Sequence, residues 1–259
     1  MDQGTTGPPL LEATGVSKRF AGIAALMDVS VTVDRGETVA LIGPNGAGKS
    51  TLFNCMAGVL RPDAGVVRLD GRDLGRLPPY HRARLGLGRT FQQIELFPGL
   101  TVLEHVIVSV RSQRRAGGLL RDLTGRSGPT ADELERCHET LELVGLEADA
   151  DRPVESLSLG RARVVELARA LVREPVLLFL DEPSSGLDVH ETAAMGDVIE
   201  TVCQEREIAV LLCEHDVSFV SRLATRTAVL DCGRCIATGP TAEVLELPEV
   251  RLAYLGTVA

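Results

Sequence analysis

The sequence predicts an α/β fold whose core is a mostly parallel sheet with helices on both faces. Three short runs, at residues 38–42, 176–180 and 208–213, are apolar almost throughout. Strands of this kind lie in sheets that are covered on both sides. Segments with helical signals separate the runs, and alternating buried strands and helices fold as parallel βαβ units. We therefore expect the three runs in one sheet, to which an antiparallel β part and a helical insertion are joined.

Length and composition indicate a soluble globular protein. The chain has 259 residues, of which 44% are hydrophobic and 24% charged. It contains no Trp and only two Tyr, and its net charge is −9. An acidic chain with few aromatic residues is poorly suited to nucleic acid or anionic lipid, so we expect neither as the main partner. The apolar runs are too short to span a bilayer, and residues 1–9 lack the pattern of a signal peptide. We expect a cytosolic protein unless a partner holds it at a membrane.

The N-terminal part has strand patterns at residues 10–16 and 29–33, and a third pattern follows at residues 66–71. These patterns predict a β part formed by residues 9–36 and 59–72. Phe20 lies between the first two strands, where it could stack on a nucleotide base or lie in the core. The residues by themselves favour the core.

A glycine-rich loop follows the run at residues 38–42, and a helical segment follows the loop. Four residues separate Gly43 from Gly48-Lys49-Ser50, which is the spacing of a phosphate-binding loop. Such a loop points backbone N–H groups at phosphates, its lysine reaches the outer phosphates, and its serine binds Mg²⁺. An ordinary glycine-rich turn is the alternative, but the flanking strand and helix and a carboxylate downstream favour a P-loop NTPase core. The residues expected to bind nucleotide here are Gly43, Pro44, Asn45, Gly46, Ala47, Gly48, Lys49, Ser50 and Thr51.

The stretch from residue 93 to residue 160 predicts a helical insertion in this core. Capping boxes begin two helices, at Thr101 with Glu104 and at Thr130 with Glu133. Residues 114–128 are rich in Gly and Arg and predict an exposed excursion between them. A third helix is expected at residues 161–172, where apolar side chains recur on one stripe.

The C-terminal third completes the core. Asp188 and Glu191 form a capping box for a helix to residue 206, residues 227–231 and 235–238 predict a hairpin, and residues 241–255 predict a helix followed by a tail. The hairpin contains Cys232 and Cys235, whose spacing can mark a metal or redox pair. No second pair or His cluster accompanies them, so a tight turn with incidental thiols is the favoured interpretation.

Two of the buried strands end in residues suited to phosphate chemistry, at the edge where parallel sheets bind ligands. Asp181 has the position of a Mg²⁺ carboxylate, and Glu182 could polarise a water molecule for attack on the γ-phosphate. The alternative, that the two acids cap a helix, is disfavoured by the Pro-Ser-Ser-Gly-Leu-Asp segment that follows. His215 could hold the γ-phosphate and the water, although its type and position alone leave this open. Gln92, at the junction of core and insertion, could contact Mg²⁺ and a moving subdomain.

These motifs, in this order, resemble those of the ATP-binding cassette (ABC) ATPases over nearly the whole chain. Besides the phosphate loop, the matching motifs are Gln92, Leu157-Ser158-Leu159-Gly160-Arg161, residues 177–181 with Glu182, residues 185–188, and His215. Within that family the chain resembles the ATPase subunits of bacterial branched-chain amino acid importers, in particular the longer of their two types. The residues that carry this closer resemblance are Arg89-Thr90-Phe91-Gln92, Leu96-Phe97, Glu214-His215-Asp216 and Ala253-Tyr254-Leu255-Gly256.

The resemblance implies one ABC ATPase domain over residues 9–256. Residues 93–160 would be its helical subdomain, residues 161–240 would complete the core, and residues 241–259 would form a C-terminal helix and tail. ATP and Mg²⁺ are the implied cofactors. Lys49, Glu182 and His215 would serve catalysis, and Ser50, Gln92 and Asp181 would lie at the metal.

The resemblance also reverses the interpretation of Phe20, which becomes the aromatic that stacks on adenine. ATP is expected between two subunits, a copy or a paralogue, with Ser158, Gly160 and Asp188 of one chain facing the ATP on the phosphate loop of the other. Integral membrane permease subunits on the inner face of the cell membrane are the expected partners, with an extracytoplasmic solute-binding protein as an indirect one. Residues 157–161 correspond to the signature motif of the family. Leu159 and Arg161 depart from its usual Gly and Gln, and the Leu159 side chain could crowd the γ-phosphate.

A transport ATPase that powers import of a small solute fits these features best, and branched-chain amino acids are the solute class that we favour. Urea-import and lipopolysaccharide-export ATPases share part of the pattern. A non-transport ATP switch of the same superfamily would have two cassettes in one chain or a long coiled-coil insertion. A phosphoryl transferase would not need the segment at residues 157–161. The sequence does not name the solute, because an ATPase subunit does not touch it.

Overall fold

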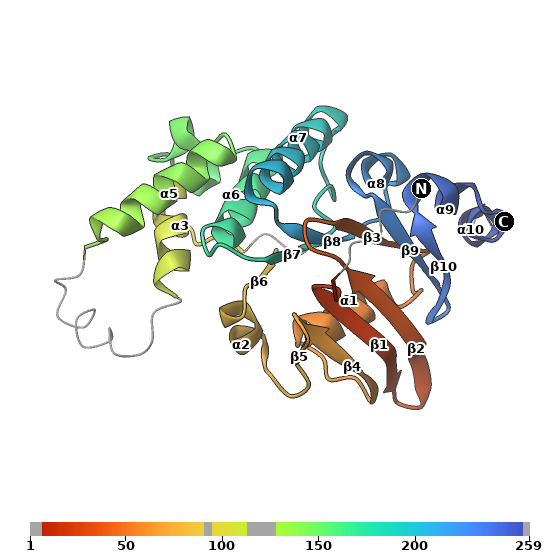
Figure 1. Cartoon of the computed structure of the whole chain (residues 1–259). Coiled ribbons are helices and arrows are strands. Elements are labelled where there is room, and N and C mark those ends of the chain that lie inside the picture. The colour runs from red at the N-terminus through yellow and green to blue at the C-terminus, as the bar shows by residue number, and fades with distance from the viewer. Residues whose placement is uncertain (1–6, 91–94, 113–127, 256–259) are drawn as a thin grey trace.

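The computed structural model describes residues 7–90, 95–112 and 128–255, which form two sheets with helices packed on them (Figure 1). The central sheet has the order β10-β9-β3-β8-β7-β6. Its members are β3 (Thr38–Ile42), β6 (Leu87–Arg89), β7 (Leu177–Asp181), β8 (Ala209–Cys213), β9 (Arg226–Asp231) and β10 (Arg234–Pro240). Only the β9–β10 pair is antiparallel among the pairs of this sheet in the described ranges. Every residue of β3, β7 and β8 is buried, so the predicted doubly covered parallel sheet is confirmed.

The second sheet is antiparallel and has the order β2-β1-β4-β5. It consists of β1 (Leu11–Phe20), β2 (Ile23–Val33), β4 (Ala64–Leu69) and β5 (Arg72–Asp73). β1 and β2 extend beyond the predicted strands and meet at the Phe20–Ile23 pair. Register shifts interrupt the β1–β2 pairing between Ala13 and Arg19. Such bulges break the two-residue alternation of side chains, which is why the sequence pattern ends early.

Helix α1 (Lys49–Ala57) lies between the two sheets (Figure 1). Its Phe53 is fully buried and contacts Phe179 of β7, with ring centroids 4.9 Å apart. Helix α2 (Pro79–Arg84) adds a buried arginine, Arg82, whose Nη1 donates to the carbonyl oxygens of Cys55 and Met56 at the end of α1. These bonds satisfy carbonyl groups that a helix leaves without partners at its C-terminus.

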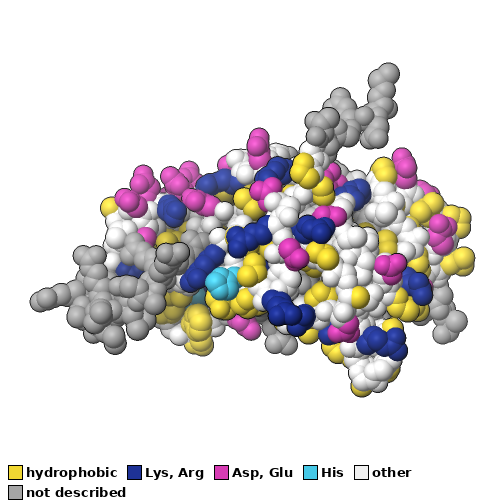
Figure 2. Space-filling model, turned by 60° about the horizontal axis from the view of Figure 1, so that its bottom comes forward, with side chains coloured by type: hydrophobic (Ala, Val, Ile, Leu, Met, Phe, Trp, Pro, Cys, Tyr) yellow, Lys and Arg dark blue, Asp and Glu magenta, His cyan; other side chains and the backbone are white. Residues whose placement is uncertain are grey.

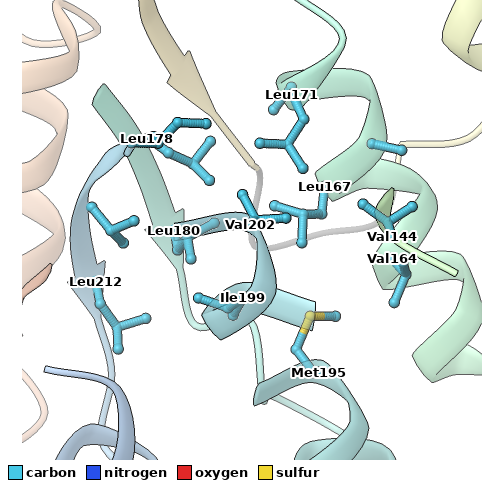
Figure 3. Close-up of a cluster of buried hydrophobic side chains, with 14 of the residues drawn as sticks. Val144, Val164, Leu167, Leu171, Leu178, Leu180, Met195, Ile199, Val202 and Leu212 are labelled. Carbon is cyan, nitrogen blue, oxygen red and sulfur yellow. The ribbon is translucent and has the colours of Figure 1, made fainter. Parts of the chain in front are cut away.

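The other face of the central sheet carries α6 (Leu159–Leu171) and α7 (Val189–Arg206). Figure 3 shows how their apolar side chains meet those of β7 and β8, including Leu167 of α6, Ile199 of α7, Leu180 of β7 and Leu212 of β8. Each of these four side chains is at most 2% exposed, and burial of one such side chain stabilises a fold by about 1.5–3 kcal/mol. This core fixes the positions of the polar residues at the ends of β7 and β8 and at the start of α6.

The helical part consists of α3 (Val102–Arg111), α5 (Ala131–Leu143) and two short 3₁₀ turns, Glu147–Asp149 and Val154–Ser156. It lies at the end of the molecule remote from β1 and β2 (Figure 1). The capping boxes predicted for α3, α5 and α7 are all present. Most of the predicted excursion at residues 114–128 lies outside the described residues, and the proposed subdomain boundaries remain predictions.

The C-terminal part contains α8 (Val217–Leu223), α9 (Thr241–Glu246) and α10 (Pro248–Leu255). The β9–β10 hairpin turns at Cys232 and Gly233, as predicted. All cysteines are free, and the described residues contain no cluster of His, Cys, Asp and Glu that could hold a metal. The sequence prediction omits β5, β6 and α8, because such short elements show no periodicity. Among the helices of the described ranges, none combines the length and apolar character that a membrane crossing needs.

Candidate nucleotide-binding site

The phosphate loop runs from β3 to α1 and depends on glycines. Gly43 and Gly48 have φ angles of 148° and 105°, in the region that favours glycine. A Cβ on Gly48 would lie 2.7 Å from the backbone oxygen of Ala25 in β2, and one on Gly43 would clash with that of Leu230 in β9. The loop is therefore packed directly on two neighbouring strands, where a side chain at either glycine would displace it.

The β9–β10 turn braces this loop from outside. Gly233 N–H donates to the carbonyl oxygen of Ala47 over 2.9 Å, and Met27 N–H donates to the carbonyl oxygen of Gly233 over 2.7 Å. The hairpin with the two cysteines thus has a structural role beside the phosphate loop, which the sequence pattern does not reveal.

Helix α1 presents its N-terminus to the loop. Its N-cap is Gly48, which has no side chain to accept from the first-turn N–H groups, and the first turn contains no acidic residue. The helix dipole and these N–H groups favour an anion at this end. Ser50 is exposed in the same turn, so its hydroxyl can face a ligand bound there.

Lys49 is folded back over the loop that precedes it. Its side chain is buried, and Nζ donates to the carbonyl oxygens of Gly43 over 2.6 Å and Pro44 over 3.1 Å. An ammonium group has three N–H donors, and two of them are engaged by these carbonyls. The loop therefore holds the charge of Lys49 at its centre, where phosphates are expected.

Asp181, at the end of β7, is buried and accepts a hydrogen bond from Arg89 Nη2 over 3.1 Å. Burial raises the pKa of Asp181, the Arg89 charge acts against this, and the nearby Glu182 and Glu214 raise the pKa further. The Arg89 guanidinium also lies over the Phe53 ring, 5.0 Å from its centroid. Arg89 thus favours the ionised carboxylate that a cation would need.

Glu182 follows at once and has a φ of 49°, which is unusual for a residue with a side chain. Its N–H donates to the carbonyl oxygen of Cys213 over 2.9 Å, which ties it to the end of β8. The N-cap of α7 is Asp188, whose Oδ1 accepts from the N–H groups of His190 and Glu191. The acids at 181 and 182 therefore do not cap the helix that follows, and the alternative weighed from the sequence is wrong.

His215 and Glu214 follow the end of β8, and their environments differ sharply. The His215 side chain is 58% exposed, whereas that of Glu214 is 0% exposed. Because β8 lies between β3 and β7, the phosphate loop, Asp181 with Glu182, and His215 meet at one edge of the sheet, as predicted.

The segment Ser158 to Arg161 begins α6, which packs on the face of the central sheet opposite to α1. Ser158 is the N-cap, and its Oγ accepts from Arg161 N–H over 3.3 Å. Gly160 N–H donates to Glu191 Oε1 over 3.1 Å. Among the described residues, no hydrogen bond of Ser158 or Gly160 reaches the phosphate loop of the same chain.

The two unusual residues of this segment have distinct surroundings. Leu159 is 43% exposed beside Gly186. Arg161 forms an ion pair with Asp149 and donates to the carbonyl oxygen of Gly145, so it joins α6 to the helical part.

Comparison with known proteins identifies the family. A family model described as ABC transporter matches residues 26–185. The chain belongs to this family. The predicted family and fold class are thereby confirmed, and as a member of it the protein is an ATP-binding ATPase.

Several relatives of this ABC ATPase match over most of their length. It is 38% identical over 251 residues to the high-affinity branched-chain amino acid transport ATP-binding protein LivG of Salmonella typhimurium, covering 96% of this chain and 98% of the relative. It is 39% identical over 245 residues to a probable anion import ATP-binding protein of Haloferax volcanii, covering 92% and 83%. The crystal structure of the ADP conformation of an ATP-binding cassette of an ABC transporter has a TM-score of 0.84 at 29% identity, covering 96% and 100%.

In this ABC ATPase Phe20 is 45% exposed, so the interpretation of Phe20 as a core residue is wrong. It lies at the end of β1 opposite Ile23, and Lys18 Nζ is 5.6 Å from its ring centroid. The same hairpin contacts Gly48 of the phosphate loop through Ala25 and Leu26. The ring is thus available for stacking near the loop.

Gln92 lies outside the described residues. The adjacent Arg89 and Thr90 line a groove of about 380 Å³ with Tyr80 of α2 and Arg169 of α6. Figure 2 views the molecule from the side of α2, and Lys and Arg side chains lie there beside exposed hydrophobic ones. The sequence prediction missed the roles of Gly233, Arg89 and Glu214 and the contact of Glu191 with Gly160, because each depends on a partner remote in sequence.

Proposed function

We propose that this ABC ATPase powers the import of a small solute by hydrolysing ATP between two cassettes. Branched-chain amino acids are the solute class that we favour. The observation that carries the proposal is the meeting of the phosphate loop, the Asp181–Glu182 pair and His215 at one edge of the sheet, on adjacent strands. The full-length similarity to LivG supports the choice of solute class. The sequence identity to a probable anion import ATP-binding protein is about as high, so transport measurements with both solute classes test this choice.

Binding would rest on the loop and the helix behind it. Backbone N–H groups and Lys49 would hold the β- and γ-phosphates, and the exposed Phe20 ring would stack on the base. Ser50 and Asp181 offer hard oxygen ligands of the kind that Mg²⁺ prefers. Mg²⁺, when bound, would offset charge on the phosphates. Gln92 would join these ligands.

Hydrolysis would use the two groups at the ends of β7 and β8. The Glu182 carboxylate would accept a proton from the attacking water, and His215 would orient that water and the γ-phosphate. His215 is well placed for this because its side chain is mostly exposed while its backbone is held by a buried carboxylate. Glu182 stands one residue beyond the metal ligand, so binding and chemistry fall on different side chains.

The second cassette would complete the site. Ser158 and Gly160 lie on a different layer from the loop of their own chain and are linked to the first turn of α7 through Glu191. This arrangement suits contact with ATP held by another subunit, with Asp188 nearby. Because Gly160 N–H is engaged by Glu191, the γ-phosphate would have to replace that carboxylate.

The groove between α2 and α6 is the proposed docking site for integral membrane permease subunits. Tyr80 and Val59 at this groove are 60% and 54% exposed, and exposed apolar side chains beside charged ones are typical of interfaces. Docking there would hold the ATPase on the inner face of the cell membrane, with a solute-binding protein acting only through the permease. Co-purification with an integral membrane protein tests this.

Glu182→Gln tests the catalytic assignment. Gln keeps the shape of Glu but is a very poor base, so hydrolysis should slow by at least ~10²-fold. ATP and Mg²⁺ ligands are untouched, so ATP should then hold two chains together as a dimer on size exclusion, whereas ADP should not. Asp181→Asn damages the metal site instead and should give no stable dimer. Hydrolysis by the Gln variant near the wild-type rate, with no dimer, would refute the assignment.

A further inference from the structure

Glu214 is a buried carboxylate that the proposed hydrolysis uses only to hold the backbone of His215. It directly follows β8, and its side chain is 0% exposed. A buried acid is costly unless hydrogen bonds compensate for lost water. The partners of Glu214 therefore indicate what it does.

The carboxylate joins two loops, one through each oxygen. Oε1 accepts from the N–H and the Oγ–H of Ser184, over 3.0 and 2.6 Å. Oε2 accepts from the N–H groups of His215 and Asp216, over 2.9 and 3.4 Å. Ser184 lies two residues after Glu182, so one side chain connects the loop of Glu182 to the loop of His215.

The backbone around Glu214 strengthens this connection. Glu182 N–H donates to the carbonyl oxygen of Cys213, and Glu214 N–H donates to that of Leu41, at the end of β3. Glu182 also has a φ of 49°. A left-handed conformation of this kind is unfavourable for a residue with a side chain, and it persists where surrounding contacts over-determine it. The contacts of Glu214 are among those that do so.

We propose that Glu214 is a positioning residue for ATP hydrolysis, which sets the placement of Glu182 relative to His215. The inference rests on the proposed function, because it takes these two side chains as the water-activating pair. Glu214 itself does not reach the nucleotide in this account. It acts through the loops that it joins and through the His215 ring, whose Nδ1 lies 3.7 Å from Glu214 Oε2.

Glu214→Gln separates this role from simple support of the fold. An amide has one oxygen acceptor and one NH₂ donor, so one end of the substituted side chain would face N–H donors that it cannot accept from. Either Ser184 or the His215–Asp216 pair would lose its anchor, while side-chain shape and packing are kept. A displacement of about 1 Å can cost up to ~10²-fold in rate. We expect kcat to fall about 10- to 100-fold and KM for ATP to change by less than about twofold.

Glu37→Gln is the matched control. Glu37 is also a mostly buried carboxylate that joins two segments, since it accepts from Arg226 Nε over 2.7 Å and from Asp34 N–H over 2.8 Å. It precedes β3 and so lies at the opposite edge of the sheet from the site. This variant should melt at a lower temperature than the wild type but keep its kcat.

The experiment measures single-turnover and steady-state hydrolysis of ATP by the full chain assembled with its permease, well below the melting temperatures of all variants. In a Glu182→Gln background, Glu214→Gln should cause little further loss, because both changes act on the same step. Ser184→Ala, which removes only the 2.6 Å bond, should lower kcat in the same direction and decides the matter if Glu214→Gln does not fold.

A kcat of Glu214→Gln equal to that of the wild type would overturn the proposal; if Glu214→Gln does not fold, the same result for Ser184→Ala would overturn it. It would also be overturned if Glu214→Gln lowered kcat by the same factor in the Glu182→Gln background as in the wild type. An equal fall in kcat for Glu37→Gln would overturn it too, since general loosening would then explain the effect. Absence of hydrolysis in the wild type would instead count against the proposed function.

Discussion

Phe20→Ala should weaken ATP binding without weakening the fold. Phe20 is 45% exposed at the end of β1 and belongs to neither cluster of buried hydrophobic residues, so its removal leaves the core intact. Stacking of a base on an aromatic ring is worth about 1–3 kcal/mol. The dissociation constant of ATP should therefore rise about ten- to a hundredfold, while the dependence of binding on Mg²⁺ stays the same.

Calorimetric titration of the full chain with ATP, and in parallel with inorganic triphosphate, measures this effect. Triphosphate lacks the base, so its affinity should be equal for the wild type and Phe20→Ala. Ile23→Ala is the matched control, because Ile23 pairs with Phe20 across the hairpin and is 76% exposed. An ATP affinity that Phe20→Ala leaves unchanged, or a triphosphate affinity that falls as much as that for ATP, would refute the stacking role.

Three further predictions concern single side chains. Lys49→Ala should abolish hydrolysis and greatly weaken ATP binding, because it removes the charge held at the centre of the loop; wild-type activity in the assembled transporter would contradict the site. Leu159→Gly should raise the ATPase rate of the assembled transporter or leave it unchanged, because it removes an exposed side chain beside the signature backbone; a sharp loss in a folded variant would show a needed contact. The free energy of unfolding should fall as pH drops below about 6.5. Burial lowers the pKa of His105 below its value in the unfolded chain; a backbone hydrogen bond to Thr101 opposes this shift, and the Arg169 charge reinforces it. The unfolded state therefore binds the proton first. Melting curves of wild type and His105→Gln at about pH 7.5 and pH 5.5 check this, and an equal loss in both proteins would contradict it.

Short contiguous segments determined much of the fold in advance. The apolar runs of β3, β7 and β8 and the capping boxes of α3, α5 and α7 are local patterns, and the structure contains each of them. The bulged β1–β2 hairpin and the short β6 and α8 were harder, because register shifts or short length remove the periodicity on which such predictions rest. The interpretation of Phe20 as a core residue failed because it rested on residue type, whereas the structure leaves Phe20 exposed at the end of β1.

The sequence by itself predicts which residues bear the chemistry of this protein. A glycine loop, two acids after a strand and a histidine after another strand are specified by residue type and spacing alone. Only the tertiary structure decided how these groups are held. Arg89 pairs with Asp181 because β6 lies beside β7, and Glu214 joins Ser184 to His215 because β8 lies beside β7. Strand order brings together side chains that lie far apart along the chain, and no local pattern encodes it.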